Sequence, residues 1–465
     1  MRLAREMSSA LLLLGMAPSA LSPAAPLPSV ERHGLLVTVG EVGSDRAALW
    51  VRGDGTTPVR LRYGSADDST AVNETTVALA AARDHTGRTV LAPLAPGTRY
   101  RYEVSHDGVE ARGTFAAAPA RDADVPVRLL WSGDRGANNY CRDGEDGYAI
   151  FRAMARHQPD FVLFVGDTIY ADQPCGTRPH LPGADYVARS LAEFHGKHRY
   201  NRADPALQAF FRTTGVFVIW DDHEVRNNFS GPTDPLMPTG LRAMLDYWPV
   251  EGPTDEPRRL YRSVRWGRHV EAFILDTRQY RSDNTAPDGP LKTMLGAAQR
   301  EWLLDGLAAS DATWKLVVTS VPLGIFTGGR HSDSWSSANL FGFARTSPSG
   351  YVHERDAILR FVRGQGLRNV VVVSGDVHHA EMIRHEPAPG FFVHELIAGP
   401  LAARRGYPRF LDRSLNSRSL ASLGFTPNFG ELVVDGSALR VGVFDASDTL
   451  RASLRLRARD ATARR

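Results

Sequence analysis

Acidic residues stand directly after four apolar runs that have the composition of buried strands. The runs read "LLWSGD", "FVLFVGD", "VFVIWDDHE" and "VVVVSGDVHH", and they deliver Asp134, Asp167, the pair Asp221 and Asp222, and Asp376. Because the carboxyl ends of neighbouring parallel strands meet at one sheet edge, these side chains are expected to cluster. Carboxylates within about 4 Å of one another repel strongly in a low-dielectric site. The pattern predicts cations between them, whereas a single such acid would be read as a turn or cap residue.

The donor atoms at this edge indicate which metals would bind. Anionic oxygens supplemented by one imidazole favour Fe³⁺, Mn²⁺, Ca²⁺ or Mg²⁺ over structural zinc. A phenolate ligand at Tyr170 points to ferric iron, because only a strongly Lewis-acidic ion lowers a phenol pKa of about 10 far enough. Ordinary packing is the alternative for Tyr170. The predicted ligands are Asp134, Asp167, Tyr170, Asp222, Asp376 and His378.

A carboxylate that bridges two cations about 3.5–4 Å apart makes a clamp suited to phosphate esters. Asp167 is the candidate bridge, because it is central in chain order and is followed by Tyr170. His223 lies beside a predicted ligand, where a general acid would protonate the leaving group, with Glu224 or Asp221 fixing its tautomer. Asp167 and His223 are therefore the predicted catalytic residues.

The chain has two cysteines, Cys141 and Cys175, and each follows one of these motifs. In an oxidising compartment they are expected to form one disulfide. Such a bond would tie two loops of the site together. The alternative is that one of them ligates a metal.

Residues 1–25 have the composition of a secretory signal peptide. Arg2 and Arg5 precede the apolar run "ALLLLGMA", and small residues follow, so cleavage is expected between Ala20 and Ala25. A mis-assigned start codon is the alternative. The run is too short to span a bilayer, and no later run approaches about 18 apolar residues. The protein is expected to be secreted or periplasmic, without a transmembrane segment.

Composition argues for a globular protein and against a nucleic-acid-binding one. Of 465 residues, 43% are hydrophobic, and the net charge is only +3. No basic face interleaved with aromatic residues is visible. The basic C-terminal tail, 451–465, alternates in character, which predicts a strand followed by a solvated terminus. A monomer is the expected state.

Two regions of different periodicity must position the acidic residues. Residues 30–119 contain short alternating strands, which predict a small β-sandwich, and "LAPLAPGTRYRYEV" resembles a fibronectin type III signature. From 125 to 450, apolar strands alternate with amphipathic helices, as in a layered α/β domain. Strands are expected at 127–134, 161–167, 216–222, 271–277, 314–321, 369–376 and 392–399. Helices are expected at 148–158, 186–199, 205–214, 297–310 and 354–366, followed by closing antiparallel strands.

The motifs, taken together, resemble those of the calcineurin-like metallophosphoesterases. The segments "GDRG", "GDTIY", "DDHE" and "GDVH" follow the order of motifs in that superfamily. The variants "WDDHEVRNN" and "SGDVHH", after a fibronectin-like region, look like the PhoD family of secreted alkaline phosphatases and phosphodiesterases, as do "LDTRQYR" and "DSW". The resemblance covers about 30–450. It implies a four-layer α/β/β/α sandwich preceded by a small fibronectin type III-like β-sandwich.

The resemblance also implies a binuclear site with Fe³⁺ and Ca²⁺, for which Mn²⁺, Mg²⁺ and Zn²⁺ are alternatives. The implied ligands of the iron are Asp134, Asp167, Tyr170 and His378. The implied ligands of the second ion are Asp167, Asp222 and Asp376, with His223 near the leaving group. The chain departs from the family pattern at Gly136 and Ser320, where the superfamily has histidines, and at Asp134, where the better-known PhoD branch has a cysteine. Candidate substrate contacts are Arg226, Asn227 and His379, and Asp172 is a further candidate.

The predicted function is that of an exported, metal-dependent phosphoesterase that hydrolyses phosphomonoesters, phosphodiesters or both by attack of metal-bound hydroxide. A phospholipase D-like phosphodiesterase is the alternative on the same fold, and an exposed apolar loop such as "SANLFGFA" beside the site would favour it. The expected partner is a small phosphate ester, with phospholipid or a polymeric phosphodiester as alternatives. A non-catalytic, calcium-stabilised surface-binding module is the alternative from another class.

Overall fold

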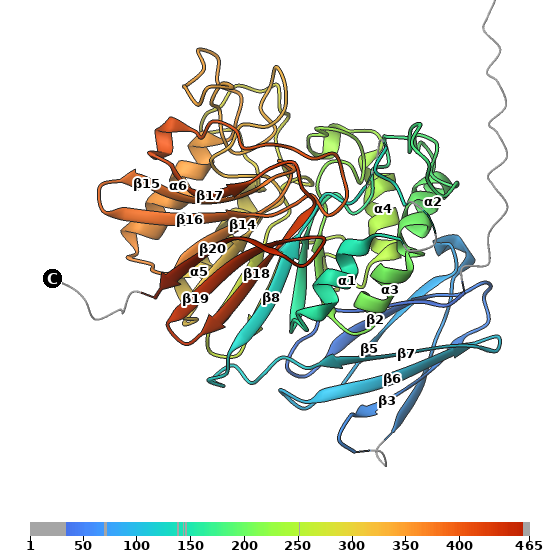
Figure 1. The fold of residues 1–465 in the computed structure, drawn as a ribbon. Coiled ribbons are helices and arrows are strands. Elements are labelled where there is room, and N and C mark those ends of the chain that lie inside the picture. Colours follow the sequence, from blue (N-terminus) through green and yellow to red (C-terminus); the bar gives the residue numbers. More distant parts are fainter. Residues whose placement is uncertain are drawn as a thin grey trace, which may run out of the picture. The chain divides into compact units, whose positions relative to one another are not determined.

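The computed structural model describes residues 34–458, except 69–71, 137–138, 143, 145–146 and 251. The expected signal peptide, 1–25, and the last residues of the basic tail, 459–465, lie outside the described residues. The described part of the chain contains three sheets and six α-helices (Figure 1).

The largest sheet has nine strands in the order β20-β19-β18-β8-β9-β10-β1-β2-β5. Its centre, β8-β9-β10, is parallel, and the expected closing strands β18, β19 and β20 are antiparallel. The parallel centre is apolar on both faces, as a sheet covered on both sides requires. The strands are β1 (Leu36–Gly40), β2 (Ala47–Arg52), β5 (Thr86–Leu91), β8 (Val127–Ser132), β9 (Phe161–Val165), β10 (Gly215–Ile219), β18 (Asn428–Asp435), β19 (Ala438–Asp445) and β20 (Leu450–Arg457).

The second sheet has seven strands in the order β11-β12-β13-β14-β16-β15-β17. Its strands β12, β13, β14 and β16 are parallel, and antiparallel strands close both edges. The strands are β11 (Arg262–Trp266), β12 (Val270–Ile274), β13 (Trp314–Val318), β14 (Val370–Ser374), β15 (Ala380–Ala388), β16 (Phe391–Ile397) and β17 (Arg418–Leu423).

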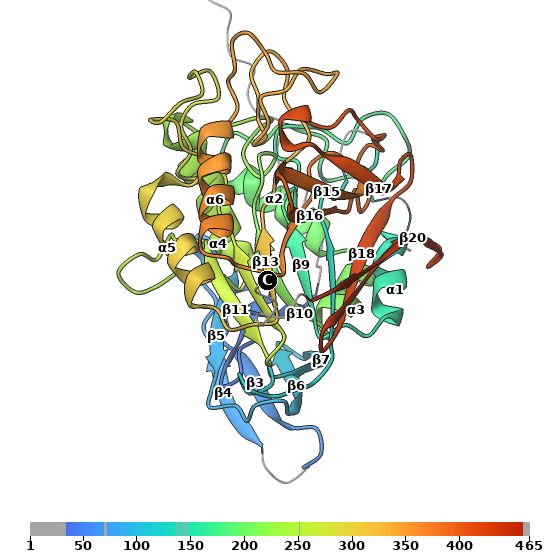
Figure 2. The same cartoon turned by 90° about the vertical axis from the view of Figure 1, so that its left-hand side faces the viewer.

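The two sheets pack face to face, and helices cover their outer faces (Figure 2). Alternation along the strands produces this arrangement, because successive side chains point to opposite faces. Ala272 and Ile274 join the core between the sheets, whereas Phe273 belongs to the core beneath the helices. The predicted four-layer α/β/β/α architecture is confirmed. The helices are α1 (Ala149–Arg156), α2 (Leu191–Arg202), α3 (Pro205–Phe211), α4 (Met237–Tyr247), α5 (Gly296–Ala309) and α6 (Val352–Gly364).

The N-terminal β region is divided between two sheets. A four-stranded sheet, β4-β3-β6-β7, stands by itself, whereas β1, β2 and β5 extend the nine-stranded sheet through parallel pairing of Gly40 with Val216. The expected domain boundary at residue 119 is therefore not a break in the sheet. The four strands are β3 (Val59–Ser65), β4 (Asn73–Val77), β6 (Arg99–His106) and β7 (Val109–Ala116).

Five of the six helices lie within a few residues of their expected ranges, and the sixth, α4, was not expected. Its first turn contains Pro238 and Gly240, which conceal the apolar period that follows. Pro238 is tolerated there because the first-turn N–H groups lack helical partners. Among the described residues, none of these helices has the length and apolar character needed to cross a membrane.

Candidate metal centre

The predicted acidic residues lie just beyond the carboxyl ends of β8, β9, β10 and β14. The turns after β8 and β9 are joined by two backbone hydrogen bonds: the N–H of Asp134 donates to the carbonyl of Gly166 (3.2 Å), and that of Arg135 to the carbonyl of Asp167 (3.0 Å). The parallel sheet thus brings residues far apart in the chain to one edge.

Four of the predicted ligand residues share an uncommon backbone conformation. Asp134, Asp167, Asp376 and His378 have φ values of 57°, 52°, 71° and 59°, in the left-handed region. Non-glycine residues adopt this region at a cost, which the surrounding structure must offset.

One group of ligand atoms comprises Asp134, Asp167 and His378, whose donor atoms lie within 4.8 Å of one another. The Oη of Tyr170 is 3.1 Å from His378 Nε2, and His378 Nε2 is 3.6 Å from Asp134 Oδ1. His378 Nδ1 is 2.5 Å from the carbonyl of Arg404, so Nδ1 carries a proton and Nε2 is left as the ligand atom. The four predicted iron ligands therefore lie together.

A second group comprises Asp167, Asp222 and His223, again with donor atoms within 4.8 Å. The backbone N–H of His223 donates to Asp167 Oδ1 (3.1 Å), and that of Asn228 donates to Asp222 Oδ2 (2.6 Å). Asp167 is common to both groups, as its predicted bridging position requires. Asp376 is outside both groups; its backbone N–H faces the Asp134 carboxyl.

The electrostatics of the cluster fit a cation-binding site. Burial, reinforced by Asp221 and Asp222, raises the pKa values of Asp134 and Asp167 well above the usual range for carboxyls. Burial, followed by Asp167 and Asp134, also raises the pKa of Tyr170. Four buried carboxylate oxygens lack a hydrogen-bond partner within the described part of the chain: Asp134 Oδ2, Asp221 Oδ2, Asp222 Oδ1 and Asp376 Oδ2. Unpartnered buried oxygens are costly, and bound cations would satisfy them.

His223 lies over the cluster with its ring stacked on Tyr170, at a centroid distance of 4.2 Å. Its Nδ1 is 2.7 Å from Asp172 Oδ1, which leaves Nε2 for a substrate. Burial lowers the pKa of this imidazole, but Asp222 and Asp172 outweigh it and raise the pKa to about 9. The raised pKa favours the protonated form of the ring.

The carboxylate that orients His223 is thus Asp172, and the expectation of Glu224 or Asp221 was wrong. Glu224 instead accepts hydrogen bonds from the backbone N–H and the Oγ1 of Thr168 and from the N–H of Asp221. These bonds join the turns after β9 and β10. Sequence spacing favoured the acids adjacent to His223. The fold instead places Asp172, which follows β9, against His223, which follows β10.

A profile of the family described as PhoD-like phosphatase matches residues 135–438. The chain belongs to the PhoD-like phosphatase family. The predicted membership is thereby confirmed.

Individual relatives agree with this membership. Alkaline phosphatase D of Bacillus subtilis (strain 168) is 28% identical over 310 residues, which cover 60% of this chain and 50% of the relative. The chain thus spans half the length of that relative. A solved structure described as PhoD matches with a TM-score of 0.72 at 20% identity, over 92% of each chain. A purple acid phosphatase from yellow lupin (Lupinus luteus) seeds matches with a TM-score of 0.63 at 14% identity, over 91% of this chain and 74% of the other. These two solved structures share the fold of this chain.

The PhoD-like chain carries a buried ion network that the sequence did not predict. Arg278 Nε donates to Asp221 Oδ1 (2.7 Å), and its terminal nitrogens donate to both oxygens of Asp333 (2.8 and 2.6 Å). Ser320 Oγ donates to the same Asp221 oxygen (2.6 Å). Asp221 is therefore paired with Arg278, whereas its neighbour Asp222 belongs to the second group of candidate ligand atoms. The sequence motifs "LDTRQYR" and "DSW" contain Arg278 and Asp333, so the residues of this network were already visible as motifs in the sequence.

Two departures of this PhoD-like chain from the superfamily motifs have local causes. A Cβ atom at Gly136 would lie 2.5 Å from the carbonyl oxygen of Tyr140 and 2.6 Å from the Oη of Tyr148, and φ there is +48°. A side chain at this position would therefore clash. At Ser320, the hydroxyl bonds Asp221 rather than facing the predicted ligands.

The three predicted substrate contacts lie in different surroundings. Arg226 is half-exposed and pairs with the buried Asp234, and Asn227 is exposed, with its backbone N–H on Asp172. His379 is fully buried, with its ring nitrogens 3.1 Å from the carbonyl of Val377 and 3.1 Å from Glu381 Oε2. The prediction that His379 contacts substrate is therefore wrong, whereas Arg226 and Asn227 remain predictions.

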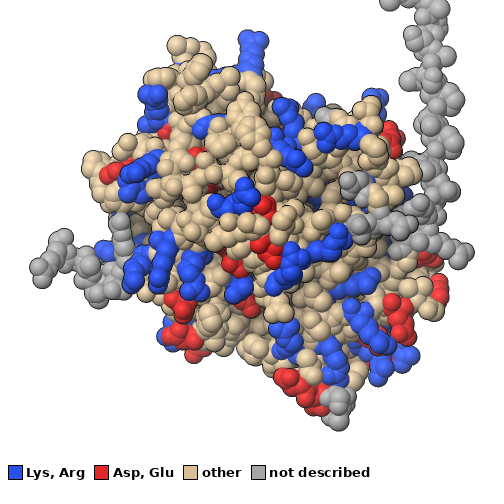
Figure 3. Space-filling model, in the orientation of Figure 1, with Lys and Arg blue, Asp and Glu red and all other residues tan. Residues whose placement is uncertain are grey.

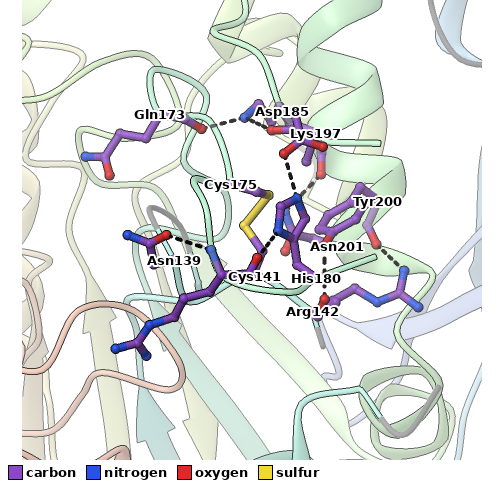
Figure 4. The surroundings of a disulfide bond; sticks show 12 residues. Asn139, Cys141, Arg142, Gln173, Cys175, His180, Asp185, Lys197, Tyr200 and Asn201 are labelled. Carbon is purple, nitrogen blue, oxygen red and sulfur yellow. Dashed lines mark hydrogen bonds and ion pairs between the residues drawn. A yellow bond between two sulfur atoms is a disulfide. The ribbon is translucent and has the colours of Figure 1, made fainter. Parts of the chain in front are cut away.

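Cys141 and Cys175 form the disulfide expected from the sequence (Figure 4). It joins the loop after β8 to the loop after β9, the two loops that follow Asp134 and Asp167. The alternative in which Cys141 ligates a metal is therefore excluded. Nearby, Lys197 Nζ donates to the carbonyls of Gln173 (2.6 Å) and Ala184 (2.8 Å), which anchors the second loop to α2.

Proposed function

We propose that this chain is an exported phosphoester hydrolase that depends on two bound cations. The observation that carries the proposal is the pair of ligand groups that share Asp167, with His223 stacked beside them. A cluster of buried acids alone would fit a structural calcium site. A buried, protonated imidazole placed beside it fits general acid catalysis.

The ligand residues divide between the two cations as the family resemblance implies. Fe³⁺ would be held by Asp134, Asp167, Tyr170 and His378, and Ca²⁺ by Asp167, Asp222 and Asp376. When bound, the cations supply Lewis-acid activation of water and of the phosphoryl oxygens. Membership of the family and the unpartnered oxygens of Asp134, Asp222 and Asp376 support this assignment.

The chain's own residues orient the ester and supply a proton. His223 holds its proton at Nε2, because Nδ1 is engaged by Asp172, and donates it to the departing ester oxygen. Arg226, half-exposed at the same turn, would bind a non-bridging phosphate oxygen after exchanging its ion pair with Asp234. Export through a signal peptide at residues 1–25 agrees with the disulfide, which oxidising compartments favour.

The test is hydrolysis of 4-nitrophenyl phosphate and of bis(4-nitrophenyl) phosphate, combined with elemental analysis and an absorption spectrum. We expect turnover, stoichiometric iron and calcium, and a visible band from tyrosinate-to-iron charge transfer. Asp167→Asn should abolish turnover and lower the content of both metals, whereas His223→Gln should lower turnover alone.

The ratio of the two rates assigns a monoesterase or a diesterase, and the phospholipase D-like alternative requires the diester. Folded, metal-loaded protein without turnover on either ester would contradict the proposal and support the non-catalytic calcium module. Stoichiometric zinc would contradict the assignment of the ions.

A further inference from the structure

Six large apolar side chains are exposed on two loops beside the metal centre. The first lies between β13 and α6; the second runs from β16 to β18 and is interrupted by the strand β17 (Arg418–Leu423); both lie in the upper part of Figure 1. We call these side chains the aromatic rim. Its members and their exposed fractions are Leu340 (67%), Phe341 (62%), Phe343 (49%), Tyr407 (59%), Phe410 (59%) and Phe425 (67%).

Members of the aromatic rim contact one another in pairs. The rings of Phe341 and Phe410 lie 5.9 Å apart between centroids, and so do those of Tyr407 and Phe425. Phe343 packs under the guanidinium of Arg413, 3.9 Å from its ring centroid. Exposed apolar side chains that gather in this way mark an interaction site, whereas scattered ones need no explanation.

Backbone hydrogen bonds hold the two loops together and to the metal centre. The N–H of Arg413 donates to the carbonyl of Gly342 (3.0 Å), and that of Phe425 donates to the carbonyl of Gly406 (2.8 Å). Gly406 in turn donates to the carbonyl of the predicted ligand His378 (2.7 Å). The rim is therefore preformed and begins next to the cluster.

The charge around the rim has one sign. Segments 324–350 and 398–427 contain two acidic residues, Asp333 and Asp412, and both are buried and paired with arginines. The same segments contain seven arginines: Arg330, Arg345, Arg404, Arg405, Arg409, Arg413 and Arg418. Blue side chains predominate over red ones in the corresponding upper part of Figure 3.

We infer that the aromatic rim docks the protein on an anionic phospholipid bilayer. Aromatic rings enter the boundary between headgroups and acyl chains, and arginines reach the anionic headgroups while their stems cover apolar surface. The rim presents protruding loop side chains surrounded by positive charge, which complements such a surface. Docking of this kind is independent of turnover, so it goes beyond the proposed phosphoesterase activity.

The test is co-sedimentation of the full chain with vesicles of phosphatidylcholine alone or of equal parts phosphatidylcholine and phosphatidylglycerol. We expect binding to the anionic vesicles that weakens with added salt. Phe341→Ser combined with Phe410→Ser should lower binding about tenfold or more. Neutralising the charge by Arg330→Gln, Arg405→Gln and Arg413→Gln should abolish the preference for anionic vesicles.

The matched controls lie on the four-stranded sheet. Val109→Ser replaces an exposed apolar residue, and Arg60→Gln, Arg62→Gln and Arg112→Gln remove the same charge as the rim variant. Both controls should bind as the parent chain does. All variants share residues 1–25, so any contribution of that segment cancels, and a far-ultraviolet circular dichroism spectrum verifies folding.

Three results would overturn the inference. They are rim variants that bind as the parent does, a parent that binds neutral and anionic vesicles equally, and rim variants that lose only self-association in gel filtration. Hydrolysis of bis(4-nitrophenyl) phosphate, measured in parallel, should be the same in parent and rim variants. Absence of turnover in the parent would count against the proposed function and leave the vesicle result standing.

Discussion

At the level of single residues, the site depends on what each carboxylate faces. Asp221 and Asp222 are adjacent, yet Asp221 Oδ1 is paired with Arg278, whereas Asp222 belongs to the second group of candidate ligand atoms. The same contrast separates Asp172, which orients His223, from Glu224, which joins two turns. Carboxylates therefore take predicted ligand positions, orienting positions or structural positions according to their partners.

Replacing Asp172 tests the orientation of His223. Asp172→Asn retains size but removes the charge that supports the imidazolium at Nδ1, so we expect kcat to fall by about 10²-fold or more. Metal content should not change. Rates on both nitrophenyl esters, with elemental analysis, measure the effect. Asp185→Asn, on an exposed carboxylate of the same loop, is the control, and equal rates for the two variants would contradict the assigned orientation.

Removing Arg278 tests the buried ion network. Arg278→Met leaves Asp221 and Asp333 buried without their cation, and breaking a buried pair in this way costs about 3–5 kcal/mol. Chemical unfolding should therefore show a loss of that size in the free energy of unfolding. Arg156→Met removes a half-exposed arginine paired with Asp448 and should cost about 1 kcal/mol or less. A similar small loss for Arg278→Met would show that the network is dispensable.

At the level of elements, the end of helix α1 is tied to the closing strands by Arg156, which pairs with Asp448, and by His157. His157, the residue after α1, lies 2.9 Å from Glu431 on β18 and 2.7 Å from Asp448 between β19 and β20. Burial lowers its pKa, but the bonds to Glu431 and Asp448 outweigh that effect and raise the pKa above its usual value. The contact therefore depends on pH.

The sign of this dependence follows from linkage. A histidine whose pKa is raised by folding stabilises the native state below its unfolded pKa of about 6.5, and this contribution disappears as pH rises through the folded value. The difference in unfolding free energy between the parent and His157→Gln should thus be largest near pH 6 and shrink as the pH becomes alkaline. Urea unfolding across this range measures it. His353→Gln, on the exposed face of α6, should show no such trend, and a constant difference for His157→Gln would refute the charged contact.

At the level of the whole molecule, the disulfide links two segments that carry ligands. Cys141 and Cys175 are separated by 34 positions, and a crosslink over such a loop contributes about 2–4 kcal/mol to stability. The double variant Cys141→Ser, Cys175→Ser should unfold at a lower temperature and bind metal less tightly, because the loops after Asp134 and Asp167 are no longer joined. Calorimetry and metal titration measure both changes. Loss of stability without loss of metal affinity would separate the bond from the site.

The amino-acid sequence by itself determined most of the strands, most of the helices and the acids at the strand ends. Apolar alternation and the residues that interrupt it are local properties, and a local pattern can be read without knowledge of the fold. The same holds for the positions of Asp134, Asp167, Asp222 and His223. The family membership also followed from the order of motifs along the chain.

The tertiary structure alone decided which residues meet. Asp172 reaches His223 across 51 positions, and Arg278 reaches Asp221 across 57, so neither pairing leaves a trace in local spacing. The burial of His379 and the exposure of the aromatic rim were decided in the same way, because apolar alternation does not reveal which loops a sheet edge brings together. Long-range contacts are set by sheet order and turn geometry, and these arise only when the whole chain is packed.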